Sequence, residues 1–159
     1  MTSETKGTSV VLKGGCQCGD IRYTSRTSSH DTYYCHCRMC QRAFGNVFAA
    51  FFNVRKDGVT WDKGALTYFA STKFARRGFC GRCGTPLAFE YLESAHMDLS
   101  VGSLDEPGSM RPTSHFGIES RLPSFYTEDG LPGKRIEDVG HIMKKWEAAY
   151  GKDVKPGPR

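Results

Sequence analysis

Residues 34–45 run Tyr34-Cys35-His36-Cys37-Arg38-Met39-Cys40-Gln41-Arg42-Ala43-Phe44-Gly45, and they place three cysteines within six positions. A disulfide between Cys35 and Cys37 would be badly strained, because only one residue separates them. A metal ion explains such closely spaced sulfurs more simply. Structural zinc sites are closed by four protein ligands, whereas catalytic ones commonly keep three and an open position. Cys35, Cys37 and Cys40 therefore predict a reactive zinc site.

The other four cysteines form two close pairs, each in a glycine-rich turn: Cys16-x-Cys18 and Cys80-x-x-Cys83. Glycine allows the backbone to fold tightly around a metal with positive φ. Together the two turns supply the four thiolates of a closed tetrahedral site, for which zinc is the best match and iron the alternative. We predict a structural zinc held by Cys16, Cys18, Cys80 and Cys83, and so two zinc ions per chain.

Two other interpretations of the cysteines are weaker. Seven unrelated core thiols would not be expected to fall into three groups with spacings of one or two residues. The segment Cys80-Gly81-Arg82-Cys83 also resembles a dithiol redox motif, but that chemistry normally needs a helix beginning at the motif. A strand pattern follows here, after Gly84-Thr85-Pro86.

Hydrophobic alternation along the chain predicts a mainly β domain. The continuously apolar run 47–54 predicts a central buried strand, and one or two helical turns are expected over 38–44, ended by Gly45. From Ile136 the apolar residues follow a helical period as far as Gly151, while 122–133 lacks a regular pattern. Shorter strands are expected at 10–12, 21–24, 33–34, 59–61, 66–69, 86–92, 97–101 and 113–118.

The expected organisation is a single domain. Residues 1–9 form a flexible N-terminus, 10–135 a zinc-binding β domain, 136–151 a C-terminal helix packed on it, and 152–159 a frayed tail. A length of 159 residues with 38% hydrophobic and 25% charged residues suits one ordinary globular domain.

Composition also limits the compartment and the partners. The polar start has no signal-peptide pattern and the longest apolar run is too short to cross a bilayer, so we expect a cytoplasmic protein without membrane contact. Thiols stay reduced there, which favours metal ligation over disulfides. Seven thiolates with two zinc ions would lower the formal net charge from +5 to +2, which disfavours nucleic acid as a partner. The pairs Arg76-Arg77 and Lys144-Lys145 are interpreted as solvated faces.

The cysteine groups and their neighbours resemble the glutathione-dependent formaldehyde-activating enzyme family, which includes centromere protein V-like domains. The resemblance covers roughly residues 10–130. It implies an all-β, tent-like zinc fold and the same four-plus-three partition of the cysteines. The segments that carry it are Gly15-Cys16-x-Cys18-Gly19-x-x-Arg22-Tyr23, Cys35-His36-Cys37-x-x-Cys40 with Gly45, and Phe79-Cys80-x-x-Cys83-Gly84-Thr85-x-Leu87.

The family's named activity is the condensation of glutathione with formaldehyde to S-hydroxymethylglutathione, and its reversal. This sequence departs from the family after Pro123, where Ser124 stands in place of the usual aromatic residue. That departure bears on the substrate more than on the fold.

Four further residues are candidates for a role at the triad, three because they are its neighbours in the sequence and one because of the family resemblance. Arg38 and Arg42 can meet substrate carboxylates, or they are exposed arginines on a short helix. His115 matches a recurrent family position and can supply a proton or hydrogen bond near the zinc, or it is a satisfied histidine in the sheet. His36, between two ligands, is interpreted as a loop-shaping residue and not as a ligand.

The sequence therefore predicts a zinc-dependent carbon–sulfur lyase acting on a thiol–aldehyde adduct, with glutathione and formaldehyde as the default pair. A non-catalytic zinc-binding interaction module is the alternative, and zinc storage or transfer is a third. The modest charge and the lack of a basic stripe count against a chromatin-binding module.

Overall fold

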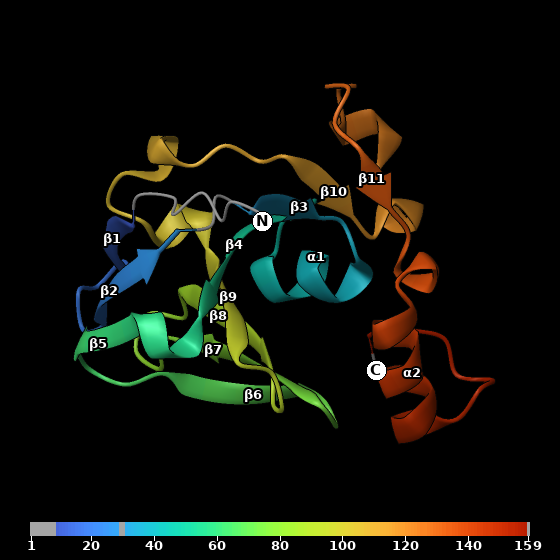
Figure 1. Ribbon diagram of the computed structural model, residues 1–159, viewed down its shortest axis with the longest axis horizontal. Coiled ribbons are helices and arrows are strands. Elements are labelled where there is room, and N and C mark those ends of the chain that lie inside the picture. The colour runs from blue at the N-terminus through green and yellow to red at the C-terminus, as the bar shows by residue number, and fades with distance from the viewer. Residues whose placement is uncertain (1–8, 29–30, 159) are drawn as a thin grey trace, which may run out of the picture.

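The computed structural model describes residues 9–28 and 31–158 (Figure 1). The predicted flexible N-terminus at 1–9 lies almost wholly outside the described residues. Strands dominate the described chain, as the apolar alternation predicts. In Figure 1 a small sheet stands beside a larger one, and a short helix lies at the far side of the molecule.

The small sheet is antiparallel and has the order β1-β2-β5. It consists of β1 (Val10–Gly15), β2 (Arg22–Thr27) and β5 (Val59–Lys63).

The large sheet has the order β11-β10-β3-β4-β9-β8-β7-β6 among the described residues. Its pairs are antiparallel except that β10 runs parallel to both β3 and β11, an arrangement that the sequence pattern does not predict. Its strands are β3 (Thr32–Cys35), β4 (Ala49–Arg55), β6 (Thr67–Thr72), β7 (Ala75–Phe79), β8 (Pro86–Tyr91), β9 (His96–Ser100), β10 (Ser114–Phe116) and β11 (Gly133–Lys134).

Strand β4 is covered on both faces, which explains its continuously apolar sequence. Phe52 packs with Leu12 and Tyr23 of the small sheet in one core cluster. Its neighbour Phe51 points to the other face and packs with the three cysteines of residues 35–40 in a second cluster. The prediction of a central buried strand is confirmed, since β4 lies between β3 and β9.

The first helix, α1 (Arg38–Phe44), is confirmed, and Gly45 ends it with a left-handed φ of 58°. The C-terminal helix α2 (Gly140–Tyr150) begins later than the helical period from Ile136 predicts. Residues Ile136–Asp138 form a 3-10 turn, and Val139 has non-helical backbone angles. The helical start at Ile136 is therefore wrong. Ile136 is buried in the second cluster, with its N–H directed at the carboxylate of Glu119, and the chain bends after it.

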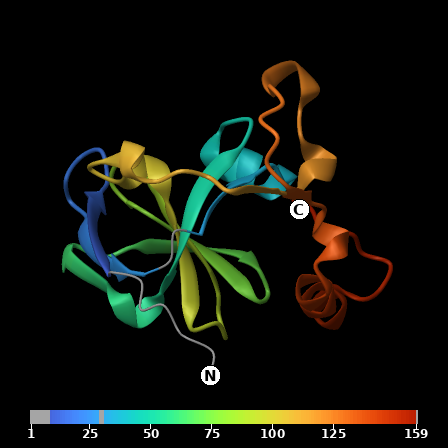
Figure 2. The same ribbon diagram turned by 45° about the horizontal axis from the view of Figure 1, so that its top comes forward.

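Helix α2 is fixed to the turn between β6 and β7. Trp146 packs edge-on against Phe74 with ring centroids 5.8 Å apart. The backbone N–H of Lys73 donates to the Tyr150 hydroxyl at 2.8 Å, and Lys73 Nζ donates to the carbonyl of Ala149 at 2.9 Å. Figures 1 and 2 show α2 at the side of the large sheet, reached through the segment 117–139.

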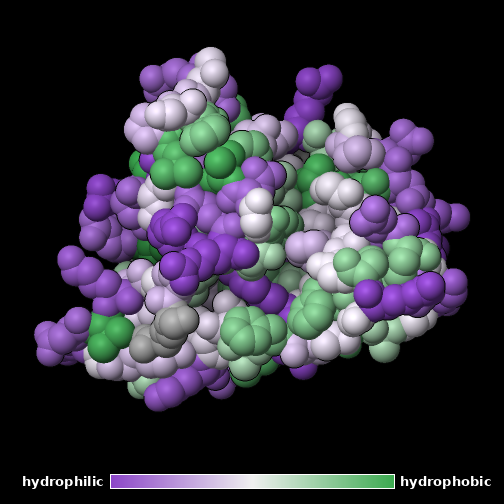
Figure 3. Space-filling model, turned by 180° about the vertical axis from the view of Figure 1, so that it is seen from behind, coloured by the Kyte–Doolittle hydropathy of each residue, from purple (hydrophilic) through white to green (hydrophobic). Residues whose placement is uncertain are grey.

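The surface seen in Figure 3 is mixed, because small hydrophobic groups are separated by hydrophilic side chains. No helix within residues 9–28 and 31–158 is long and apolar enough to span a lipid bilayer.

Candidate metal centres

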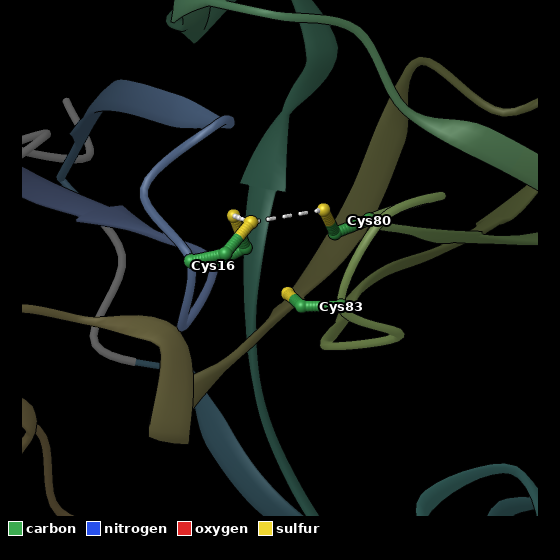
Figure 4. A group of neighbouring side chains, drawn as sticks. Cys16, Cys80 and Cys83 are labelled. Atoms are coloured by element: carbon green, nitrogen blue, oxygen red, sulfur yellow. Dashed lines mark hydrogen bonds between the residues drawn. The ribbon is translucent and has the colours of Figure 1, made fainter.

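The four-cysteine joint (Cys16, Cys18, Cys80 and Cys83) connects the small sheet to the large one. All four sulfur atoms lie within 4.8 Å of one another. The Cys18–Cys80 sulfur distance is 3.7 Å, and tetrahedral zinc with bonds of about 2.3 Å places sulfurs about 3.8 Å apart. In Figure 4 the sulfurs of Cys16, Cys80 and Cys83 point toward a common centre. The residues therefore fit a closed metal site.

The two turns of the joint have the same backbone shape. In each, the N–H of the first cysteine donates to the carbonyl five residues later, Cys16 to Ile21 at 3.1 Å and Cys80 to Thr85 at 3.0 Å. Each turn closes with a left-handed glycine, Gly19 at φ 78° and Gly84 at φ 77°. These two glycines are required by the turn conformation, as the sequence predicts.

Polar groups lie within hydrogen-bonding distance of two sulfurs of the joint, those of Cys16 and Cys83. The N–H of Ile21 donates to Cys16 Sγ at 3.2 Å. The Thr85 hydroxyl lies 3.1 Å from Cys83 Sγ, and this hydrogen bond is the main cause that lowers the pKa of the Cys83 thiol to about 5. An ion pair between Arg82 and Asp20, at 3.0 Å, joins the two turns at the surface.

The triad (Cys35, Cys37 and Cys40) lies within one continuous segment from the end of β3 to the middle of α1. Its three sulfurs are within 4.8 Å of one another and all three residues are buried. The Cys35–Cys37 sulfur distance is 3.5 Å, and the N–H of Cys40 points at Cys37 Sγ at 3.4 Å. The triad fits a metal with three protein ligands, which leaves a fourth position for another group.

Arg77 of β7 lies beside the triad, although the sequence interpretation placed it on a solvated face. That interpretation is wrong for Arg77, which is only 8% exposed. Its Nη2 donates to Cys40 Sγ at 3.4 Å, and its Nε donates to Ser71 Oγ at 3.1 Å. Sulfur contacts with Cys35 and Cys37, and then the charge of Arg77, hold the pKa of the Cys40 thiol well below its usual range.

Strand alternation explains the different roles of the two neighbouring arginines. Arg76 points to the other face, where it pairs with the buried carboxylate of Glu90 at 2.6 Å. Neighbouring arginines in a strand point to opposite faces, so in a sheet with one covered face one of the two points to the covered side.

A cavity of about 750 Å³ lies against the triad, and its walls include Cys35, Cys37 and Cys40. Its polar lining includes Arg77, Asn53 and Asp98. Much of the remaining wall is aromatic, with rings from Tyr33, Phe51, Phe74, Phe89, Tyr91 and Trp146. The sequence patterns do not predict this cavity, since its walls come from segments far apart in the chain.

His115 and His36 form a buried hydrogen-bonded chain behind the triad. His36 Nε2 and His115 Nδ1 are 2.8 Å apart, and His115 Nε2 lies 3.0 Å from the Asp129 carboxylate. Burial lowers the pKa of His36 to about 4, so its ring is neutral at physiological pH. Phe116 packs in the triad's cluster, and strand neighbours point to opposite faces, so the His115 ring lies behind the sheet. His115 contacts His36 directly, and it is also among the residues that line the cavity beside the triad.

The backbone near His115 also holds the triad segment in place. The His36 N–H donates to the Phe116 carbonyl at 2.8 Å. Gly117 has a φ of 67°, and a Cβ there would lie 2.9 Å from the backbone nitrogen of Cys37. No local sequence signal marks Gly117, because its requirement comes from a contact with Cys37, 80 positions away in the sequence.

Arg38 and Arg42 are exposed on α1 and do not line the cavity. Arg38 instead contacts the side chain of Gln41, which donates to the Ser120 carbonyl at 2.9 Å. Ser124, the departure from the family pattern, lies exposed in the 3-10 turn Pro123–Phe125. The structure thus brings the predicted metal ligands together and leaves the two predicted substrate arginines outside.

Two clusters of convergent cysteines on a mainly β scaffold could each hold a metal ion, and one of them lies against a cavity. The model of the family described as glutathione-dependent formaldehyde-activating enzyme matches residues 11–120, more than half of the chain. The chain belongs to this family.

Two individual proteins are similar to this chain. A protein of Schizosaccharomyces pombe described as an uncharacterized lyase is 34% identical over 79 residues, which are 50% of this chain and 57% of that relative. A crystal structure of a Rhodobacter sphaeroides protein has a TM-score of 0.51 at 20% identity, covering 77% of this chain and 99% of that one. The first match spans little more than half of the relative's length, and the second supports the fold alone.

Proposed function

We propose that this protein is a zinc-dependent carbon–sulfur lyase that forms and cleaves a thiol–aldehyde adduct, with glutathione and formaldehyde as the default pair. The observation that carries the proposal is that three buried cysteine sulfurs line one wall of a cavity large enough for a small molecule. Family membership and the lyase description of the yeast relative support a lyase-type activity.

The reaction is an addition that needs no redox cofactor. A thiol R–SH and an aldehyde R′–CHO join through a new sulfur–carbon bond, and the thiol proton ends on the former carbonyl oxygen. Cys35, Cys37 and Cys40 would hold the zinc, which would supply a Lewis acid and a ligand position for a substrate sulfur.

The chain's own residues support this chemistry by position and charge. Three thiolates around one dication leave a net negative site, and the buried guanidinium of Arg77 balances that charge through Cys40. His115 takes a positioning role, because it fixes His36 between two of the proposed ligands. The three cysteines are at most 4% exposed, and this burial strengthens the electrostatic effect of Arg77.

Reduced thiols are required throughout, so we place the activity in the cytoplasm, with small thiols and aldehydes as partners. We propose no role for nucleic acid or membranes.

A non-catalytic interaction module is the second candidate. The observation that favours it is the exposure of Phe125 and Leu122, at 68% and 37%, on the segment that carries Ser124. Exposed apolar side chains of this kind are common at protein interfaces.

A metal count combined with an adduct-exchange assay tests the proposal. Purified chain should carry two metal ions, chiefly zinc, and should accelerate exchange between free formaldehyde and S-hydroxymethylglutathione as followed by NMR. Cys37→Ser should keep one metal ion and lose the acceleration. Ser124→Ala changes an exposed residue and should keep two metal ions and the full acceleration. Two metals with no acceleration for any thiol would favour the interaction module. One metal under zinc-replete conditions would contradict the second site.

A further inference from the structure

The cavity beside the triad is walled by aromatic rings, and these rings bear on the organic part of the substrate. Tyr33 and Phe51 face it from β3 and β4, Phe89 and Tyr91 from β8, and Phe74 and Trp146 from the β6–β7 turn and α2. Flat aromatic walls favour apolar groups, which gain free energy when they leave water.

The charges of the cavity do not suit a carboxylate near the sulfurs. Arg77 is a buried cation in the part of the cavity wall that the structure describes, and its guanidinium already donates to Cys40 Sγ. The side chain of Asp98 is 8% exposed and accepts a hydrogen bond from Asn53 Nδ2 at 2.9 Å. Burial raises the pKa of Asp98 to about 6, so it carries negative charge at neutral pH. The other acidic, basic and histidine lining residues are the exposed Asp31, His96, Lys134 and His141. His115 is buried, and its Nε2 is already paired with the Asp129 carboxylate.

Part of the apolar wall comes from outside the family match. That match ends at residue 120, whereas α2 begins at Gly140 and contributes Ile142 and Trp146 to the cavity. Trp146 is only 2% exposed, and Lys73 holds the end of α2 through its bonds to Ala149 and Tyr150. The helix is therefore a fixed wall, added by this chain's own C-terminal segment.

We propose that the cavity selects a thiol, or its aldehyde adduct, whose sulfur is carried by an uncharged aromatic or branched apolar group, in preference to glutathione. Helix α2 sets this preference through Trp146. The inference rests on the proposed function, because it takes the triad as the place where the substrate sulfur binds. It replaces the default thiol partner and leaves the reaction unchanged. A volume of about 750 Å³ accommodates such a group together with a small aldehyde.

Tryptophan fluorescence of the zinc-loaded full chain gives a direct test. The chain has two tryptophans, so a Trp61→Phe background leaves Trp146 as the reporter inside the cavity. Phe at position 61 keeps an aromatic contact with Tyr23, whose ring centroid is 5.5 Å away. The probes are 2-phenylethanethiol and glutathione, each with its S-methyl thioether, which fills the cavity without offering a thiolate.

The phenylethyl thioether should change Trp146 fluorescence and bind at least about tenfold more tightly than S-methylglutathione. The phenylethyl thiol should bind more tightly than its thioether, and calorimetry should give the same order. In the chain that retains Trp61, Trp146→Ala should weaken the phenylethyl probes about tenfold or more while both metals stay bound. Ile142→Glu adds a charge to the same wall and should also weaken the phenylethyl probes. It serves as the test if the Trp146→Ala variant does not fold. Glu147→Gln, exposed on the same helix, is the matched control.

The outcomes separate the two proposals. The apolar preference is overturned if the glutathione probes bind as tightly as the phenylethyl probes or more tightly. It is also overturned if neither Trp146→Ala nor Ile142→Glu changes the affinity for the phenylethyl probes. Tight binding of the phenylethyl thioether without any gain from a free thiol supports the apolar cavity and contradicts the proposed thiol chemistry at the triad.

Discussion

The four-cysteine joint and the triad use the same ligand atom in opposite structural settings. The joint takes two sulfurs from each of two sheets, and residues Cys18 and Cys80 are 62 positions apart. The triad takes three sulfurs from a single segment between β3 and α1, one wall of a cavity. A metal in the joint would connect two sheets that also share one hydrophobic core, whereas a metal in the triad would connect residues of a single segment. We therefore expect the setting, and not the ligand type, to separate a structural site from a reactive one.

The largest expected effect is on folding. Cys80→Ser should abolish soluble expression or lower the melting temperature sharply, because apparent zinc-binding free energies of about 10–16 kcal/mol appear as folding free energy at such sites. Cys37→Ser should remove the second metal and leave the fold largely intact. Thermal unfolding by circular dichroism, with metal content measured on the same samples, compares the two. Equal destabilisation by both variants would remove the distinction between joint and triad.

The next effect concerns the buried carboxylate of Asp98 on the triad side. Burial raises its pKa from 3.8 to about 6, so the folded state holds the proton more tightly than the unfolded state. Asp98 therefore makes the free energy of unfolding fall by about 2 kcal/mol as pH rises from about 4 to about 6. The Asp98→Asn variant should not show this fall in the free energy of unfolding, and it should be more stable than the wild type above pH 6.

Urea unfolding of both proteins from pH 5 to pH 8 checks this difference at each pH. Asp57→Asn is the control, because Asp57 is exposed and its pKa is lowered, first by hydrogen bonding to Arg55. A difference between wild type and Asp98→Asn that does not change with pH would contradict the raised pKa.

Arg77→Met should weaken the affinity of the triad for its metal by about tenfold, or about 1.4 kcal/mol, because the negative triad loses its buried counter-charge. The metal of the joint should keep its affinity. Arg77→Lys should recover part of the loss, since it restores the charge without the fork of donors. Titration against a chromophoric chelator separates the two metals. A similar weakening of both would mean that Arg77 acts on the fold and not on the triad.

The smallest effects are expected on the outer face of α1. Arg38→Ala and Arg42→Ala should each change stability by less than about 0.5 kcal/mol and thiol affinity by less than about twofold, because both side chains are exposed outside the cavity. Calorimetric titration with glutathione measures the affinity. A tenfold loss in either variant would instead support the sequence-based prediction that these arginines hold substrate carboxylates.

Features encoded locally were predictable from the sequence. The partition of the cysteines follows from their spacing, and Gly45 ends α1 because its left-handed conformation is a local requirement. The run at 47–54 predicts a strand buried on both faces, since the sequence lacks the alternation of a half-exposed strand. The family resemblance, carried by the same cysteine groups, is confirmed by the family match to residues 11–120.

Features that depend on distant neighbours were not predictable. A local pattern cannot show that β10 pairs parallel with β3, and this pairing brings Gly117 against Cys37 and His115 against His36. Arg77 was assigned to the surface because its burial depends on a contact with Cys40, 37 positions away in the sequence. The bend at Val139 was hidden because Ile136 keeps the helical period while packing in the triad's cluster. Substrate choice belongs to this second class, since the cavity is assembled from such contacts.

The long sequence separation within the joint has a consequence for how the chain reaches its native state. Cys18 lies 17 positions from Cys35 but 62 from Cys80, and closing the shorter loop costs about 1 kcal/mol less conformational entropy. In an unfolded chain, the cysteines of the first hairpin therefore meet those of the triad more often than their native partners. Zinc added before the sheets assemble should bind cysteines of the first hairpin together with cysteines of the triad. Refolding should then be slow, because these ligands must exchange for the native ones. Zinc added after collapse should give faster recovery and a higher yield of folded protein.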